Sequence, residues 1–119
     1  MKILVVDDSL TMRRILKNTL TRIGYSDFVE AADGADALAL LEGIDFVITD
    51  WNMPNMDGLT FVKTVRKHPS YKSLPIIMVT TEAGREDIIE AIKFGVNNYV
   101  VKPFTPEVLR QKIDQTLQK

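Results

Sequence analysis

The chain has 119 residues, of which 15 are basic and 16 acidic, so its formal net charge is −1 at pH 7. A charge this close to zero does not favour nucleic acid or an anionic membrane as a partner. The absence of cysteine excludes disulfides and thiolate metal sites, and a single histidine, His68, is too few for a His-clustered zinc or iron site. No apolar stretch approaches the roughly 20 residues of a membrane span, and Asp7–Asp8 interrupt the apolar start too early for a signal peptide. We therefore expect one domain over residues 1–119, located in the cytoplasm.

Apolar runs and segments of helical periodicity alternate along the first half of the chain. Residues 3–6 are wholly apolar, which is typical of a strand covered on both faces. Ser9 can cap a helix that continues with helical spacing to a stop at Gly24. A weaker strand is predicted at residues 28–31 and an Ala/Leu-rich helix at about 35–41.

The same alternation continues to the end of the chain. The next predicted elements, strands and helices in turn, are residues 46–49, 59–66, 75–80, 87–94 and 99–101. A last helix opens at Thr105 as N-cap, with Pro106 at its first position. Five strand–helix units in a chain this short predict an α/β fold, with a doubly wound parallel sheet, right-handed crossovers and helices on both faces.

Charged and hydroxyl side chains follow four of the predicted strands. The carboxyl ends of parallel strands share one edge of the sheet, where functional groups gather in folds of this kind. The residues expected at that edge are Asp7, Asp8, Asp50, Thr80, Thr81 and Lys102. Three carboxylates, a hydroxyl pair and an ammonium group are therefore predicted to converge.

Three adjacent carboxylates need a counter-charge. Two unit charges ~4 Å apart repel by roughly 4 kcal/mol at an effective dielectric of about 20, so three pairs cost on the order of 10 kcal/mol. That is comparable with the ~5–15 kcal/mol stability of a whole domain. Lys102 can offset one charge, and a divalent cation can neutralise the other two. An all-oxygen site with room for water suits Mg²⁺. For Asp7 and Asp8 alone, an acidic first helical turn would be an equally good explanation.

These groups together predict phosphoryl-transfer chemistry. Asp50 is the candidate nucleophile, as carboxylates are in aspartyl-phosphate formation. Mg²⁺ held by Asp7 and Asp8, with Lys102 opposite, would neutralise charge on the transferring group, and the Thr80 hydroxyl can donate to a phosphoryl oxygen. The sequence has no Gly-rich phosphate-binding loop, so we expect the donor to be another protein's phosphoryl group or a small phosphodonor.

The same positions carry a resemblance to a known family. Asp7–Asp8, Asp50, Thr80 and Lys102–Pro103 match the motif set of the response-regulator receiver domain, and the likeness spans the whole chain. The stretches DDSLTMRR, TDWNMPNMDG, MVTTEAG and NYVVKPFT resemble the CheY family of chemotaxis regulators. The resemblance implies a flavodoxin-like (βα)5 fold with strand order 2-1-3-4-5, for which CheY is itself a standard example. It also implies a cis Lys102–Pro103 peptide. Thr81 departs from the small residue that is common at its position in the family.

The resemblance further implies a ligand set and partners. The Mg²⁺ ligands would be Asp8, Asp50 and the backbone carbonyl of Asn52, with Asp7 acting mostly through water. The donor would be a CheA-like histidine kinase and the output partner a FliM-like flagellar motor switch protein, with a phosphatase as a further partner. Asn52 and Glu82 occupy positions that tune water access, which implies a short-lived phosphoryl group. The protein would be no enzyme beyond its own phosphorylation and dephosphorylation.

Tyr99 is open to two interpretations. From the sequence alone, a static ring at a strand start is the simpler one. The resemblance implies instead a switch aromatic that swings inward when Thr80 moves toward the phosphoryl group. The partner surface would then lie around Arg85, Ile88, Tyr99 and Lys112.

Several alternatives stay open at this point. Within the receiver class, a phosphorelay intermediate or a phosphate sink would share the same active-site edge. A phosphatase with an Asp nucleophile needs a second Asp two residues on, where this chain has Asn52, and a flavin carrier prefers a hydroxyl- and glycine-rich first loop. The basic residues Arg13, Arg14, Lys17 and Arg22 are interpreted as a solvated helix face, with a kinase-docking edge as the alternative.

Overall fold

The computed structural model describes residues 1–118, in which strands and helices alternate as predicted. The sheet order is β2-β1-β3-β4-β5, and every neighbouring pair of strands is parallel. The elements are β1 Lys2–Val6, α1 Leu10–Arg22, β2 Asp27–Ala31, α2 Gly34–Leu38, β3 Phe46–Thr49, α3 Gly58–Lys67, the 3-10 turn η1 Pro69–Tyr71, β4 Ile76–Thr80, α4 Arg85–Lys93, β5 Asn98–Val101 and α5 Pro106–Leu117.

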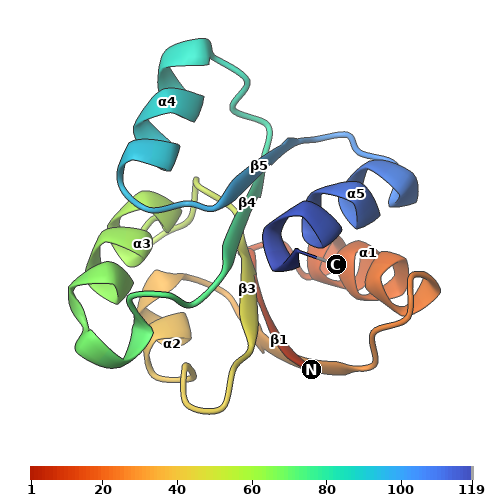
Figure 1. Cartoon of the computed structure of the whole chain (residues 1–119), viewed down its shortest axis with the longest axis horizontal. Coiled ribbons are helices and arrows are strands. Elements are labelled where there is room, and N and C mark those ends of the chain that lie inside the picture. Colours follow the sequence, from red (N-terminus) through yellow and green to blue (C-terminus); the bar gives the residue numbers. More distant parts are fainter. Residues whose placement is uncertain (119) are drawn as a thin grey trace.

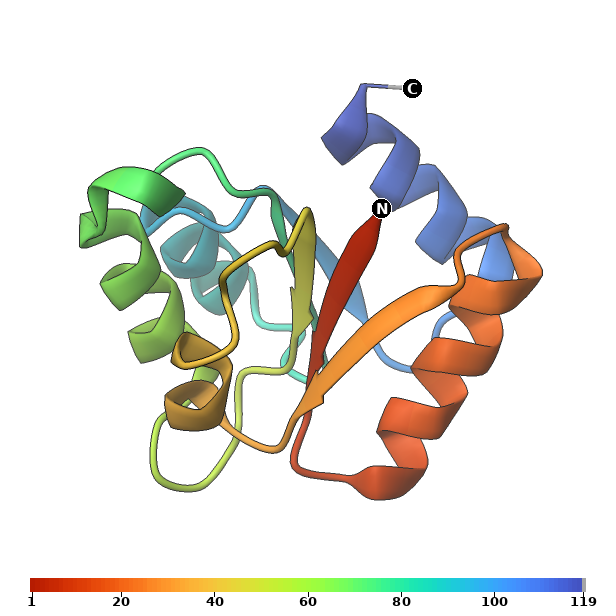
Figure 2. The ribbon, with the colours of Figure 1, turned by 90° about the horizontal axis from the view of Figure 1, so that it is seen from below.

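Helices cover both faces of this sheet. In Figures 1 and 2, α1 and α5 lie on one side, while α2, α3 and α4 lie on the other. Successive strand side chains point to opposite faces. Ile3 and Val5 therefore pack with α1 and α5, and Leu4 and Val6 pack with the other three helices. All four side chains are fully buried, which explains why the strand sequence is apolar throughout rather than alternating.

The strand register brings the candidate site residues to one edge of the sheet. Hydrogen bonding continues one residue beyond the strands: the backbone N–H of Asp50 donates to the carbonyl of Val6 at 2.9 Å, and that of Lys102 donates to the carbonyl of Thr80 at 2.8 Å. The residues just after β1, β3 and β5 are thus fixed by the ladder itself rather than left on free loops.

Two helix boundaries differ from the prediction. The helix predicted at about 35–41 ends at Leu38, because the N–H groups of Ala39 and Leu40 bond three residues back and tighten the last turn. Leu41 lies outside the helix but is only 4% exposed. It is apolar because it packs into the core, not because it continues the helix. The helix predicted from residue 87 begins at Arg85, with Gly84 as its N-cap.

The remaining local predictions fit the structure, with one addition. The side chains of Ser9 and Thr105 accept hydrogen bonds as N-caps of α1 and α5. The unpredicted turn η1 starts at Pro69, where exposed His68 accepts from the Ser70 N–H through Nδ1 at 3.1 Å. Within residues 1–118, no helix combines the length and the apolar character needed to cross a membrane.

Candidate functional site

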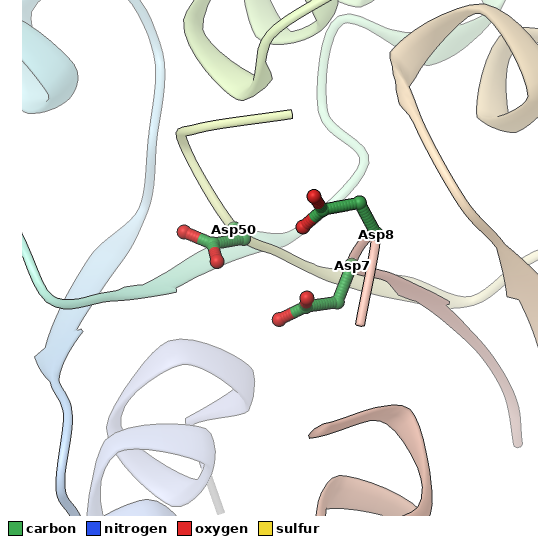
Figure 3. Close-up of side chains that lie close together, drawn as sticks. All are labelled: Asp7, Asp8 and Asp50. Carbon is green, nitrogen blue, oxygen red and sulfur yellow. The ribbon is translucent and has the colours of Figure 1, made fainter. Parts of the chain in front are cut away.

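Three carboxylates meet at the carboxyl edge of the sheet. Asp7 and Asp8 follow β1 and Asp50 follows β3, and each offers an oxygen within 4.8 Å of the others. Figure 3 shows the three side chains close together, with those of Asp7 and Asp8 extending toward the side on which Asp50 lies. Asp7 is buried, Asp50 is half-buried and Asp8 is exposed, so the cluster grades from the core to solvent. The predicted convergence of these carboxylates is present in the structure.

Lys102 shares its single positive charge between two of these carboxylates. Its Nζ lies 2.8 Å from Asp50 Oδ2 and 3.0 Å from Asp7 Oδ2. Burial raises the pKa of Asp7 more than its hydrogen bonds and the nearby cation lower it. Burial lowers the pKa of Lys102, but the hydrogen bonds that its ammonium group donates to Asp50 and Asp7, with the negative charges of both, outweigh burial, and the net direction is upward. Lys102 therefore stays charged at neutral pH. The Lys102–Pro103 peptide is cis, as the resemblance implied.

The three carboxylates differ in how many of their oxygens are already engaged. Asp7 Oδ1 accepts from the Ser9 N–H at 2.9 Å, and Asp50 Oδ1 accepts from the Trp51 N–H at 2.6 Å. Among the described residues, Asp8 has no hydrogen-bond or ion-pair partner. Asp8, the most exposed of the three carboxylates, is thus also the one with the fewest protein partners. An all-oxygen donor set with an open side fits a hard divalent cation that keeps part of its water.

A hydrogen bond between two side chains links the loops that follow β3 and β4. Asn52 Nδ2 donates to Glu82 Oε1 at 2.7 Å and links the loop after β3 to the loop after β4. The two residues that the resemblance identified for lifetime tuning are therefore in direct contact. Thr80 is fully buried, and its Oγ1 accepts from the Glu82 N–H at 3.4 Å.

Tyr99 lies inward in this structure. Its side chain is 8% exposed, and its hydroxyl donates to the Glu82 carbonyl at 2.7 Å. Burial, together with the negative charges of Asp87, Glu82 and Asp50, raises the pKa of Tyr99 to about 12. The inward swing predicted for phosphorylation is not tested, since the ring already occupies the inner position.

The surface formed by α4, β5 and α5 contains the other predicted partner residues. Arg85 is exposed, Ile88 packs partly against the core and Lys112 is half-buried on α5. Sequence reasoning missed the apolar side chains that stand out on this surface. Helical spacing could have predicted their exposure, because Ile89 and Ile92 do not lie on the buried face of α4. The exposed side chains are Ile89, Ile92, Val101 and Val108.

The basic stretch of α1 is only partly the solvated face that was predicted. Arg13 Nε and Lys17 Nζ contact the two oxygens of Glu30 at 3.0 and 2.9 Å. The Lys17 hydrogen bond, with that of Arg13, lowers the pKa of Glu30 despite some desolvation. Arg13 Nη1 also donates to the Asp7 carbonyl at 2.6 Å, which ties this helix to the site. Arg14 is exposed, as predicted.

Gly58 is a site residue that sequence reasoning did not identify. Its N–H donates to the Trp51 carbonyl at 2.7 Å, and a Cβ built on it would collide with the Asp50 carbonyl oxygen. Only glycine permits this close approach, which folds the loop after β3 back beneath the candidate nucleophile. The glycine in the stretch MDG was the available signal.

The comparisons with known proteins agree with this geometry. Residues 3–114 match the family model described as the response regulator receiver domain. The chain belongs to this family. The receiver domain is 58% identical to a chemotaxis protein CheY homolog of Campylobacter jejuni over 98% of this chain and 92% of that protein. It is 56% identical to chemotaxis protein CheY1 of Helicobacter pylori over 98% and 97% of the two chains.

A solved structure gives the same result. Chemotaxis protein CheY4 of Vibrio cholerae superposes on the receiver domain with a TM-score of 0.88 at 42% identity, covering 97% of both chains. The predicted fold, strand order and family are therefore confirmed, and so is the prediction of a chemotaxis response regulator.

Proposed function

We propose that Asp50 accepts a phosphoryl group from the phosphohistidine of a CheA-like histidine kinase. One observation supports this above the others: the Asp50 carboxylate lies 2.8 Å from Lys102 Nζ and within 4.8 Å of Asp7 and Asp8. An Asp50 oxygen would form the new P–O bond while the P–N bond of the donor breaks. The imidazole keeps the electron pair and takes up a proton, so the exchange balances.

Mg²⁺ is the proposed cofactor, and when bound it supplies neutralising charge for the transferring group. Asp8, Asp50 and the backbone carbonyl of Asn52 would hold it, with Asp7 acting through water. The direct role of Asp8 agrees with its lack of a hydrogen bond or ion pair among the described residues, whereas both oxygens of Asp7 and both oxygens of Asp50 already accept hydrogen bonds. Lys102 orients the Asp50 carboxylate and stays beside the phosphoryl oxygens.

Phosphorylation is proposed to alter the surface made by α4, β5 and α5. A phosphoryl group adds roughly −1.5 to −2 charges and three acceptor oxygens, and the Thr80 hydroxyl would donate to one of them. Movement of Thr80 would stabilise the inward position that Tyr99 occupies in this structure, and so hold the partner surface of Arg85, Ile88 and Lys112 in one arrangement. A FliM-like flagellar motor switch protein is the proposed partner. The exposed Ile89 and Ile92 favour such a binding output over a phosphate sink.

The remaining roles are part of the same proposal. The protein acts as a receiver over residues 1–119 in the cytoplasm and turns over no substrate besides its own phosphoryl group. Asn52 and Glu82 would control water access and hence phosphoryl lifetime, with or without a phosphatase. Because their side chains share a hydrogen bond, replacing each by Ala should change the decay rate constant non-additively.

The test is phosphorylation of the whole chain with a small acyl phosphate and Mg²⁺, followed by intact mass. We expect stoichiometric label on the wild-type protein and none on Asp50→Ala. The labelled protein should then gain affinity for an N-terminal FliM peptide. Label on Asp50→Ala would refute the phosphoacceptor assignment, whereas labelling without any gain in affinity would leave a sink or relay as the function.

A further inference from the structure

A hollow with only basic and aromatic lining lies between α3 and α4. Its volume is about 320 Å³, and we name it the basic cup. In a doubly wound sheet the helices run back from the carboxyl edge, so their last turns lie at the opposite, amino edge. Figure 1 shows α3 and α4 side by side on one face of the sheet. The residues of the cup are Lys63, Arg66, Lys67, Lys93 and Phe94. We propose that the basic cup binds an acidic segment of a partner protein.

The positive charge of the cup is not neutralised within the molecule. Among residues 1–118, none of its four cations forms an ion pair. This includes pairs with Glu90, which lies one turn before Phe94. The carboxyl ends of α3 and α4 each contribute a partial charge of about −0.5, which together offset roughly one of the four cations. A local charge of about +3 therefore remains on a chain whose total is −1.

Three of the four cations of the cup make contacts within it. Lys63 Nζ lies 4.1 Å from the centroid of the Phe94 ring, and Lys93 Nζ lies 5.9 Å from the same centroid. Arg66 forms the base of the cup, where it donates to the carbonyls of Gly95 and Tyr71 and to Asn97 Oδ1 at 2.8–3.0 Å. Side chains that are already ordered lose less entropy on binding an anion.

The size and shape of the cup favour carboxylates on a short peptide over an extended polyanion. A duplex needs a basic stripe across a face, whereas this hollow admits only a few side chains, and the acidic remainder of the surface would repel a long polyanion. Phe94 is 37% exposed and offers an apolar contact beside the ammonium groups. An acidic segment with one apolar side chain matches both features.

The experiment measures binding of a short fluorescein-labelled peptide, in which glutamates flank a leucine, to the full chain at low ionic strength. Lys63→Gln with Lys93→Gln removes two cations of the cup and leaves Arg66 in place. Arg14→Gln with Arg22→Gln is the matched control, because it removes two exposed cations of α1 that form no ion pair in the described chain. We expect the wild type and the control to bind alike and the cup variant to bind about tenfold more weakly.

Each other outcome would overturn the proposal. Absence of binding to the wild type would refute the site, and equal weakening in both variants would leave net charge as the only effect. Equal binding of a peptide with glutamine in place of glutamate would exclude carboxylate recognition. Tighter binding of duplex DNA with the same dependence on Lys63 and Lys93 would reassign the cup to nucleic acid. Phosphorylation by an acyl phosphate should be unchanged in both variants, so this result is separate from the test of Asp50.

Discussion

The two edges of the sheet concentrate charge in opposite ways. At the carboxyl edge, three carboxylates surround one ammonium group, and Lys102 bridges Asp7 and Asp50. At the amino edge, Arg66 is held by neutral carbonyl and amide oxygens, and no carboxylate pairs with the cations around it in the described chain. Both groupings follow from the fold, since helix N-termini meet one edge and helix C-termini the other.

The contrast shows that the spacing of like charges at each edge determines how large the ion or group that neutralises them must be. At the carboxyl edge the oxygens converge within 4.8 Å, so a single small cation satisfies them. At the amino edge the cations are spread around a hollow of about 320 Å³, so a larger anionic group is needed. The following four predictions test this difference, beginning with the largest expected effect.

Mg²⁺ should stabilise the protein through the carboxyl edge alone. Binding to the folded state adds about 2.7 kcal/mol to the free energy of unfolding when free ion exceeds its dissociation constant 100-fold. We expect Asp8→Asn to lose most of this gain and Lys63→Gln to retain it. Urea unfolding followed by circular dichroism, with and without Mg²⁺, measures the difference. An undiminished gain in Asp8→Asn would place the ion elsewhere.

Arg66→Met, at the amino edge, should lower the free energy of unfolding by about 2 kcal/mol. The substitution removes hydrogen bonds to Gly95, Tyr71 and Asn97, although the freed carbonyls can partly rehydrate. Arg66→Lys should not restore stability, because an ammonium group lacks the planar fork that reaches all three acceptors. Exposed Lys67→Met is the control and should stay within about 0.5 kcal/mol of wild type. Rescue by lysine would show that charge, not geometry, matters here.

Lys102→Met should lower the free energy of unfolding by about 1–2 kcal/mol at neutral pH in the absence of metal. Removing one partner of a buried pair costs roughly 3–5 kcal/mol, and the open side of this site reduces that penalty. Because burial raises the pKa of Asp7, this carboxyl takes up a proton at a higher pH than usual and then no longer needs a cation. The cost of Lys102→Met should accordingly shrink as the pH falls toward 4. A cost independent of pH would contradict the electrostatic explanation.

The titration of Tyr99 gives the smallest expected effect. Its pKa rises from 10.0 to about 12 on folding, chiefly through burial and then through Asp87, Glu82 and Asp50. A raised pKa contributes stability that is complete below pH 10 and is lost as the pH rises through about 12. The wild type should therefore lose on the order of 1 kcal/mol relative to Tyr99→Phe by pH 11. Parallel stability curves for the two proteins between pH 10 and 12 would exclude the shift.

The fold could be read from the sequence because burial leaves a local signature. Residues 3–6 and 46–48 are apolar throughout, since helices cover both faces of their strands, and Ser9 and Thr105 mark helix starts by their own side-chain hydrogen bonds. Parallel strands then place Asp7, Asp50 and Lys102 at one edge without further information. The family resemblance supplied the strand order and the Mg²⁺ ligand set.

Contacts between distant segments had no such signature. Tertiary packing alone decided that Lys102 bridges two carboxylates, that Arg13 bonds the Asp7 carbonyl and that Tyr99 reaches Glu82. The basic cup likewise required α3 and α4 to be placed together. Periodicity reports which side chains are buried, because burial acts on each residue separately. It cannot report which partner a side chain meets, because that depends on where the chain returns after tens of residues.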